Sequence, residues 1–444
     1  MSRRDRVLSV AILSAGLLVR LLLPGLLGVN PYGGDGAVYA QYAANMQEHG
    51  IYSEDPQPPL HSSTRRMPGV PVQIWLLQRL VAPDSWLLLL PNVLMGWGCM
   101  LMVFVLLRGL RIRTPLLHVV MAIYATVPVL DYYARQLYPE VPAAFLTLLS
   151  WYFLFRFLHS PSPRPLFLAG LFLGLSLYFR PEMVLHLAPL GIAVLLVKVT
   201  TGRRWLLGTL ALASTLLVLS PWILRNLVTQ GRLIPLVHTP EDCRRGLNSW
   251  VNSWSSSERH FKTFGWQFLD ARREEFPAHA FDTPEERAAV LGIHGDAFYT
   301  CQEDRILADI ARQRNRRRPF RGYVLLPLGR VWNLTFRTER SDTFRPQGAP
   351  QRLVAAAWLA YAGLANLVML LALILPLVFR RLPPILLLIF MALVLRLLAF
   401  AYLHHVESRY MVSLFPLAFV CAAYFVNRSL GFWSSQARRR IIEW

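Results

Sequence analysis

Ten long apolar runs constrain the fold of this chain more than any other feature of its sequence. A transmembrane helix needs about 20 mainly apolar residues, because the hydrocarbon core of a bilayer is about 30 Å thick. With 54% hydrophobic residues among 444, the chain is too apolar for a soluble protein of this size. We therefore predict an all-α polytopic membrane protein whose candidate spans lie at residues 7–29, 85–107, 116–132, 138–158, 166–180, 182–198, 205–224, 352–379, 383–403 and 410–427.

Basic residues in the loops test this number of spans. Short cytoplasmic loops carry an excess of Lys and Arg, so the loops between true spans should alternate in basic content. They do alternate, and the basic side is the side of the N-terminus, where Arg3, Arg4 and Arg6 precede the first run. Both termini are therefore expected in the cytoplasm. The other basic residues on that side are Arg108, Arg111, Arg113, Arg156, Arg164, Lys198, Arg203, Arg204, Arg380, Arg381, Arg428, Arg438, Arg439 and Arg440.

The opposite, outer side receives two segments that are long enough to shape a site. Residues 30–84 follow the first span, and residues 225–350 are polar and are typical of short helices joined by turns. We expect an N-terminal transmembrane catalytic module at 1–235, which includes the first of these outer segments. A large outer loop or small domain follows at 236–350, and the C-terminal spans with a basic tail occupy 351–444.

The formal net charge of +20 limits the partners of the chain. In a membrane protein, cations first set the topology and can then hold anionic lipid or phosphate. Nucleic acid is therefore not an expected partner. Arg20 and Arg396 lie inside apolar runs, so both should face the protein interior or a cavity, where helix contacts are as good an explanation as catalysis.

The four cysteines show no spacing typical of a metal site. Cys99 and Cys421 fall inside apolar runs and are expected to be inert. Cys243 and Cys301 share the large outer segment, and they would form a disulfide if that segment faces an oxidising compartment.

Asp35 is the carboxylate that stands out, because it lies immediately outside the first apolar run in Gly33-Gly34-Asp35-Gly36. The glycines let the backbone leave the membrane helix sharply. Residues 36–49 are predicted to form a short helix that ends at Gly50, with Tyr39 among the residues on its buried face. Asp35 then lies at a helix start, where an N-cap is the structural alternative to a chemical role.

Further polar clusters lie at the outer ends of the spans. A site with carboxylates, arginines and aromatic rings at the lipid boundary fits a substrate with a phosphate, a sugar and a hydrocarbon tail. Arginine forms bidentate hydrogen bonds with phosphate, and aromatic rings stack on a sugar. The clusters are Arg65–Pro71, Asp131–Glu140, Arg180–Glu182, Pro221–Asn226 and His404–Tyr410.

These clusters resemble motifs of the polyprenyl-phosphate-sugar-dependent glycosyltransferases of the GT-C fold, specifically the protein mannosyltransferase and aminoarabinose transferase group, family 39. The resemblance covers residues 7–235 well and the final spans loosely, and residues 236–350 match nothing that we can assign. It rests on Asp35 with Tyr39 and Ala43, on Arg66–Pro71, Tyr138–Glu140, Phe179–Glu182 and Pro221–Asn226 with Gly231 and Pro235, and on Ser408–Tyr410 with Pro416.

The resemblance implies an inverting transfer of sugar from undecaprenyl phosphate to an acceptor hydroxyl on the periplasmic side of a bacterial inner membrane. Asp35 would be the general base. The chemistry agrees, because a sugar 1-phosphate carries its own leaving group and needs a base for the acceptor and cations for the departing phosphate. The acceptor is a lipid, a polysaccharide or a protein, and the sequence does not choose among them.

The resemblance also assigns roles to other residues. Glu140 would be a second catalytic acidic group, although a glutamate at a helix N-terminus is also favoured by the helix dipole. The sugar or the acceptor would contact Tyr39, Tyr52, His405 and Glu407; an aromatic belt and ordinary polar contacts are the alternatives. The donor phosphate would be bound by arginines that otherwise extend to lipid headgroups, namely Arg66, Arg225 and Arg409, with Arg135 and Arg180 behind them.

No cofactor is expected. Many members of the family have Asp-Glu where this chain has Asp35-Gly36, and a single carboxylate is a poor site for a divalent metal ion. Two other functions remain open. An O-antigen ligase or polymerase would use a diphosphate-linked donor, and a transporter of lipid-linked sugars would use the arginines as a headgroup pathway, although transporters commonly show repeated halves and this sequence shows none.

Overall fold

The computed structural model is built of helices, and no strand occurs among the residues that it describes. The chain divides into two compact units. Unit 1 comprises Met1–His238, Thr338–Leu393 and Val412–Trp444, and unit 2 comprises Thr239–Arg337 and Val394–Met411. The described residues are 2–26, 32–82, 85–127, 133–238, 245–265, 276–293, 300–336, 349–379, 382–403 and 407–442.

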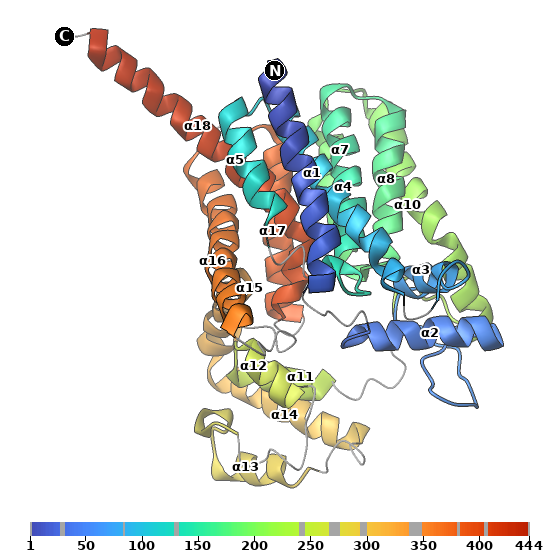
Figure 1. Ribbon diagram of the computed structural model, residues 1–444. Helices are drawn as coiled ribbons and strands as arrows, with labels where there is room; N and C mark the ends of the chain where they lie inside the picture. Colours follow the sequence, from blue (N-terminus) through green and yellow to red (C-terminus); the bar gives the residue numbers. More distant parts are fainter. Residues whose placement is uncertain are drawn as a thin grey trace. The chain divides into compact units, whose positions relative to one another are not determined.

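Unit 1 contains the long apolar helices of the chain (Figure 1). The packing follows the order of the chain in most cases: α1 packs on α4 and α5, α4 packs on α7, α7 packs on α8, and α8 packs on α10. Near the C-terminus, α16 packs on α18. The helices are α1 (Arg3–Leu26), α4 (Leu90–Gly109), α5 (Thr114–Ala125), α7 (Glu140–His159), α8 (Pro163–Leu177), α9 (Leu187–Leu196), α10 (Thr201–Gln230), α16 (Ala349–Val378), α17 (Pro384–Leu403, whose last part falls in unit 2) and α18 (Phe415–Ile442).

Each of the ten predicted runs contains helix among its described residues, so the all-α polytopic fold is confirmed. In the described parts of the chain, five helices are long and apolar enough to cross a membrane, namely Trp86–Gly109, Glu140–His159, Thr201–Gln230, Pro384–Tyr402 and Arg409–Gly431. Shorter apolar helices lie at Thr114–Ala125, Pro163–Leu177, Pro181–Leu196 and Asn366–Val378. The short fifth run, 166–180, corresponds to one of these shorter helices, and the number of spans stays a prediction.

Arg20 and Arg396 are buried, as predicted, with 1% of each residue exposed. Arg20 on α1 donates from Nη1 to the carbonyl oxygen of Gly16 at 2.9 Å, and it reaches the carbonyl oxygens of Tyr124 and Ala125 at 3.5 Å each. Those two carbonyls belong to the last turn of α5, where a helix lacks its own donors. A guanidinium with several N–H groups therefore stabilises a helix end inside an apolar bundle.

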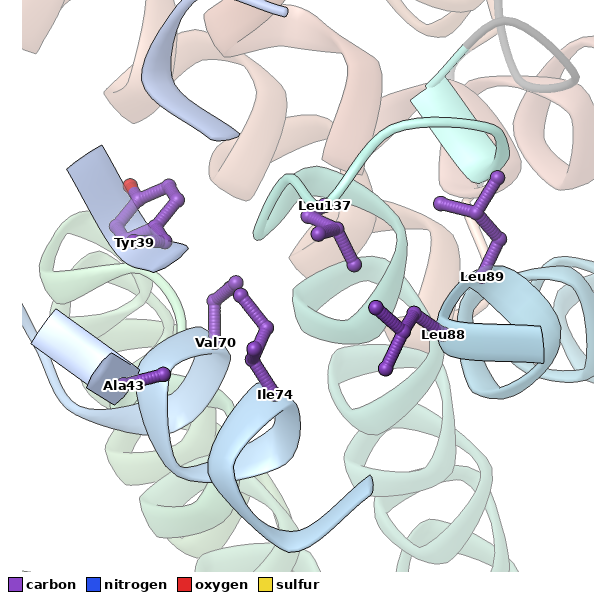
Figure 2. Close-up of a cluster of buried hydrophobic side chains, with 7 residues drawn as sticks. All are labelled: Tyr39, Ala43, Val70, Ile74, Leu88, Leu89 and Leu137. Atoms are coloured by element: carbon purple, nitrogen blue, oxygen red, sulfur yellow. The ribbon is translucent and has the colours of Figure 1, made fainter. Parts of the chain in front are cut away.

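The first outer segment folds into two short helices joined by a loop. α2 (Asp35–His49) ends at Gly50, whose φ of 68° is the left-handed conformation predicted for the stop. α3 (Gly69–Leu77) follows the loop, and the 3₁₀ helix η1 (Trp86–Leu89) then leads into α4. A buried cluster joins these elements, and Figure 2 shows its seven side chains together: Tyr39, Ala43, Val70, Ile74, Leu88, Leu89 and Leu137.

Unit 2 packs short helices around aromatic side chains, with Trp250, Trp254 and Phe261 almost fully buried. The Asp304 carboxylate accepts hydrogen bonds from the N–H groups of Gly246 and Leu247 at 2.8 and 2.9 Å. These contacts hold the start of α11 on α14. The elements are α11 (Arg245–Trp254), α12 (Glu258–His260), η3 (Phe261–Gly265), η5 (Ala278–Ala280), α13 (Pro284–Leu291), α14 (Cys301–Arg317), η6 (Arg321–Leu325) and α15 (Leu326–Phe336).

Candidate active site

Asp35 is the first residue of α2 and is not its N-cap. That position belongs to Gly34, and no side chain caps this helix. The Asp35 carboxylate instead accepts a hydrogen bond from Nη2 of Arg66 at 3.2 Å. The two side chains are 17% and 29% exposed, so this ion pair keeps access to solvent. The structure thus brings together the predicted base and one of the predicted phosphate-binding arginines.

Gly34 and Tyr138 fix the backbone on which Asp35 stands. Gly34 has a φ of 56°, a conformation that residues with a side chain adopt with strain. The N–H of Asp35 donates to the hydroxyl oxygen of Tyr138 at 3.2 Å, and a Cβ atom on Gly34 would lie only 2.3 Å from that same oxygen. The sequence motif contained Tyr138, but its contact with Asp35 was not predicted.

Two tyrosines lie beside Arg66. The Arg66 guanidinium lies 5.8 Å from the ring centre of Tyr39, and the Tyr52 hydroxyl donates to the Arg66 carbonyl oxygen at 3.1 Å. Burial raises the pKa of Tyr39 to about 12, and burial also raises the pKa of Tyr52. Both phenols are therefore neutral at ordinary pH and cannot serve as the base. The contacts of Tyr39 and Tyr52 with a sugar or an acceptor stay predictions.

Glu140 and Arg180 form a second ion pair. Glu140 is the first residue of α7 and is 1% exposed, and Nη2 of Arg180 donates to its Oε1. Arg180 also pairs with Glu182 at 3.3 Å. Burial is the main cause of the raised pKa of Tyr39. The charges of Arg66, Asp35, Arg180 and Glu140 have smaller effects on it, so both ion pairs lie near this phenol. Because Glu140 is buried and paired, it is suited to holding Arg180 in place.

Arg225 is engaged in contacts with the loop between α2 and α3. From α10, its Nη1 donates to the Ser63 carbonyl oxygen at 2.7 Å, and its Nη2 donates to Oγ of Ser62. Its guanidinium lies over the rings of Tyr52 and Trp222, at 5.2 and 5.1 Å from their centres. These contacts bind the loop to α10. A role for Arg225 in phosphate binding stays a prediction.

The remaining predicted residues have different surroundings. Arg135 is 1% exposed, in the segment before α7. Arg409 belongs to unit 2, where its Nε lies 2.7 Å from Oε1 of Glu407. His405 and Cys243 lie outside the described residues, so the histidine contact and the Cys243–Cys301 disulfide stay predictions.

Metal ligands do not gather anywhere in the described parts of the chain: no group of three or more His, Cys, Asp or Glu side chains there could hold an ion. The described site offers the partly exposed carboxylate of Asp35, the partly exposed guanidinium of Arg66 and the neutral phenol of Tyr39 near that guanidinium. Such a set can accept a proton at Asp35 and stabilise an anion at Arg66.

Residues 64–224 match the family model of the dolichyl-phosphate-mannose-protein mannosyltransferases. The match confirms the family resemblance stated from the sequence, and it covers about a third of the chain. It includes Arg66, Arg135, Glu140 and Arg180, and it ends one residue before Arg225. Asp35 lies outside it, so the assignment of Asp35 depends on the geometry described above.

No curated protein matches the chain. Among solved structures, ArnT from Cupriavidus metallidurans bound to undecaprenyl phosphate aligns with 94% of this chain and 77% of its own, at 14% identity and a TM-score of 0.45. The apo state of the same protein aligns with 89% of this chain and 72% of its own, at 14% identity and a TM-score of 0.38.

Proposed function

We propose that this chain is a membrane glycosyltransferase that moves a sugar from a polyprenyl-phosphate donor to an acceptor hydroxyl on the periplasmic side of a bacterial inner membrane. The family match over residues 64–224 supports the enzyme class, and the apolar helices support the membrane setting. The observation that carries the proposal is the partly exposed Asp35–Arg66 pair at the start of α2.

Asp35 is the base in this proposal because it is more accessible than Glu140 or Tyr39 and because it is the carboxylate that contacts Arg66. Glu140 is 1% exposed and paired with Arg180, and the pKa of Tyr39 is raised to about 12 by burial. A base must reach the proton that it removes, and of these three groups Asp35 has the accessible carboxylate. Glu140, which the sequence suggested as a second catalytic group, is therefore assigned the role of positioning Arg180.

The transfer is a single displacement at the anomeric carbon. The acceptor oxygen forms its bond to that carbon while the bond to the phosphate oxygen breaks, which inverts the configuration. The proton of the acceptor hydroxyl goes to Asp35, and the electron pair of the broken bond leaves with the phosphate. Arg66 then stabilises the departing phosphate, because its five N–H donors allow it to bind the phosphate and still contact Asp35.

Replacement of the base tests the proposal directly. We expect Asp35→Asn to lower the transfer rate by about 10²–10⁴-fold, since a positioned general base contributes about that much. Donor binding should persist, because asparagine keeps the shape of the side chain. The matched control is Glu48→Gln, which removes an exposed carboxylate from the same helix. Transfer by Asp35→Asn at the rate of the unmodified protein would remove Asp35 from catalysis.

Metal dependence offers a second test. In this proposal Arg66 supplies the positive charge that a divalent ion would otherwise provide, so transfer should survive dialysis against EDTA. The measurement is the initial rate before and after chelation, with and without added Mg²⁺ or Mn²⁺. Loss of transfer on chelation, with recovery on adding either ion, would overturn the metal-free mechanism.

A further inference from the structure

A cavity of about 390 Å³ lies in unit 2, where the chain passes from η5 into α13. Its wall combines aromatic rings with charged side chains, and a cavity of this size is in the range that binds small molecules. The wall includes Phe276, Ala278, Phe281, Asp282 and Arg287.

The aromatic part of the wall is anchored in the core of the unit and keeps exposed surface. Phe276 and Phe281 are both partly exposed, and their rings meet edge to face with centres 5.7 Å apart. The buried ring of Trp250 contacts both, at 5.5 Å from Phe276 and 6.2 Å from Phe281. The face of an aromatic ring is electron-rich and attracts the C–H bonds on one face of a sugar ring. The two phenylalanines therefore suit a pyranose.

Arg287 adds a cation to this wall. The residue is exposed, and its guanidinium lies 6.0 Å from the ring centre of Phe281. No carboxylate in the described parts of the chain forms an ion pair with it. A guanidinium binds a carboxylate or a phosphate through two of its five N–H donors. Arg287 can therefore bind an acidic group on a ligand whose ring lies against Phe281.

Asp282 adds a hydrogen-bond acceptor and draws further arginines toward the cavity. Its Oδ1 lies 3.0 Å from Arg314, and Arg318 and Arg321 lie at 3.7 and 3.9 Å from the same oxygen. These contacts all use Oδ1, so Oδ2 can accept from a ligand hydroxyl. Glu286 also pairs with Arg314, so two carboxylates face three arginines here, in addition to the cation described above. The excess positive charge favours an anionic ligand.

We propose that this cavity binds an acidic sugar of the acceptor, a pyranose that carries a carboxylate or a phosphate. The ring stacks on Phe276 and Phe281, the acidic group binds Arg287, and a hydroxyl donates to Asp282. This assignment rests on the proposed function and adds to it the chemical class of the acceptor. It selects a saccharide, carried either by a lipid or by a polysaccharide. A phosphopeptide would offer the anionic group without the ring, so the experiments must exclude it.

Binding of a small sugar acid tests the cavity without depending on transfer. Methyl glucuronide and neutral methyl glucoside are titrated into the full-length protein in detergent, and binding is followed by saturation-transfer-difference NMR. We expect the glucuronide to bind about 10-fold more tightly, and Arg287→Ala to abolish this difference, because charge-assisted hydrogen bonds are lost. The matched control is Arg305→Ala, at an exposed arginine of α14 outside the lining. Equal affinities for the two sugars, or equal effects of the two substitutions, would overturn the assignment.

Transfer from a donor with a labelled sugar tests the role of the cavity in acceptor binding. The acceptors are envelope glycans of the source strain, extracted once as glycolipid and once as polysaccharide, which separates the two carriers. Ala278→Trp fills the cavity from an exposed position, and Ala289→Trp, exposed on α13 and outside the lining, is the control. We expect Ala278→Trp to lower the initial rate about 10-fold at limiting acceptor, with recovery at excess acceptor and no change in KM for the donor.

The outcomes of the two experiments separate this assignment from the proposed function. An unchanged rate in Ala278→Trp at limiting acceptor would overturn the assignment. Label found only in protein, or inhibition by a phosphoserine peptide without inhibition by methyl glucuronide, would do the same. Arg287-dependent binding of the glucuronide by a protein that transfers no sugar would keep the sugar site and remove the proposed function.

Discussion

Arg66 in the first outer segment and Arg314 in unit 2 show two different uses of the same residue type. Arg314 is 3% exposed, pairs with Asp282 at 3.0 Å and with Glu286, and donates to the Ala280 carbonyl oxygen. Arg66 pairs with Asp35 but leaves 29% of its side chain exposed. Arg314 is enclosed by groups of its own fold, whereas Arg66 can still meet a ligand. Exposure therefore distinguishes these two carboxylate–guanidinium groups: the Arg314 group is enclosed, and the Arg66 pair is open to a ligand.

The largest expected effect is on the folding of unit 2. Arg314→Leu would leave Glu286 buried without its cation, and removal of one partner from a buried pair costs about 3–5 kcal/mol. Asp282 would keep only the more distant Arg318 and Arg321, at 3.7 and 3.9 Å. Thermal unfolding of the detergent-solubilised protein measures this loss. Arg312→Ala, on the same helix, removes an exposed pair with Asp309 and should cost less than about 1 kcal/mol. If Arg314→Leu kept its stability but lost transfer, the Arg314 network would belong to the active site. The contrast between a structural Arg314 and a functional Arg66 would then be wrong.

A smaller effect, on transfer and not on folding, is expected at Arg66. Arg66→Gln removes the cation proposed for the departing phosphate, so kcat/KM should fall by about 10²–10³-fold. Stability should change by less than about 1 kcal/mol, because the pair with Asp35 is screened by solvent. The adjacent Arg65→Gln breaks an exposed pair with Glu54 and serves as the control for initial rates. Equal losses of transfer in the two variants would show that Arg66 has no special role.

The smallest effect concerns Tyr39 and appears only in alkali. Burial raises the Tyr39 pKa from 10.0 to about 12, so its contribution to stability is complete below pH 10 and declines as the pH rises toward 12. At pH 11 the loss amounts to about 1.4 kcal/mol relative to pH 8. Tyr39→Phe lacks this group, so its stability should fall less over that range. The free energy of unfolding of both proteins is measured from pH 8 to 11. An equal loss in the two proteins would show that the phenol is not buried as described.

The local features of this fold could be predicted from the sequence. The apolar runs become helices because length and composition decide whether a segment can cross a bilayer. α2 was predicted with its stop at Gly50, because a left-handed glycine ends a helix through its own backbone. α3 was not predicted, since a nine-residue segment that is apolar on all sides shows no helical periodicity.

The site depends on contacts between distant residues, which sequence patterns do not report. Arg66 meets Asp35 across 31 positions, and Arg225 meets Ser63 across 162. The motifs placed Arg66 and Arg225 in one list, and the structure gives them different partners. Arg225 contacts the loop between α2 and α3, whereas Arg66 pairs with Asp35. Tyr138 was identified only as part of a motif, and its hydrogen bond with the Asp35 N–H could not be predicted from the sequence.

The close approach of residue 34 to residue 138 has an evolutionary consequence. The Tyr138 oxygen occupies the space that any side chain on Gly34 would require, 2.3 Å from its Cβ position. A side chain at position 34 would therefore collide with Tyr138 and displace the backbone that leads to Asp35. Among sequences that share this architecture, position 34 should therefore remain glycine even where residue 138 is smaller, because the positive φ at position 34 disfavours every residue with a side chain.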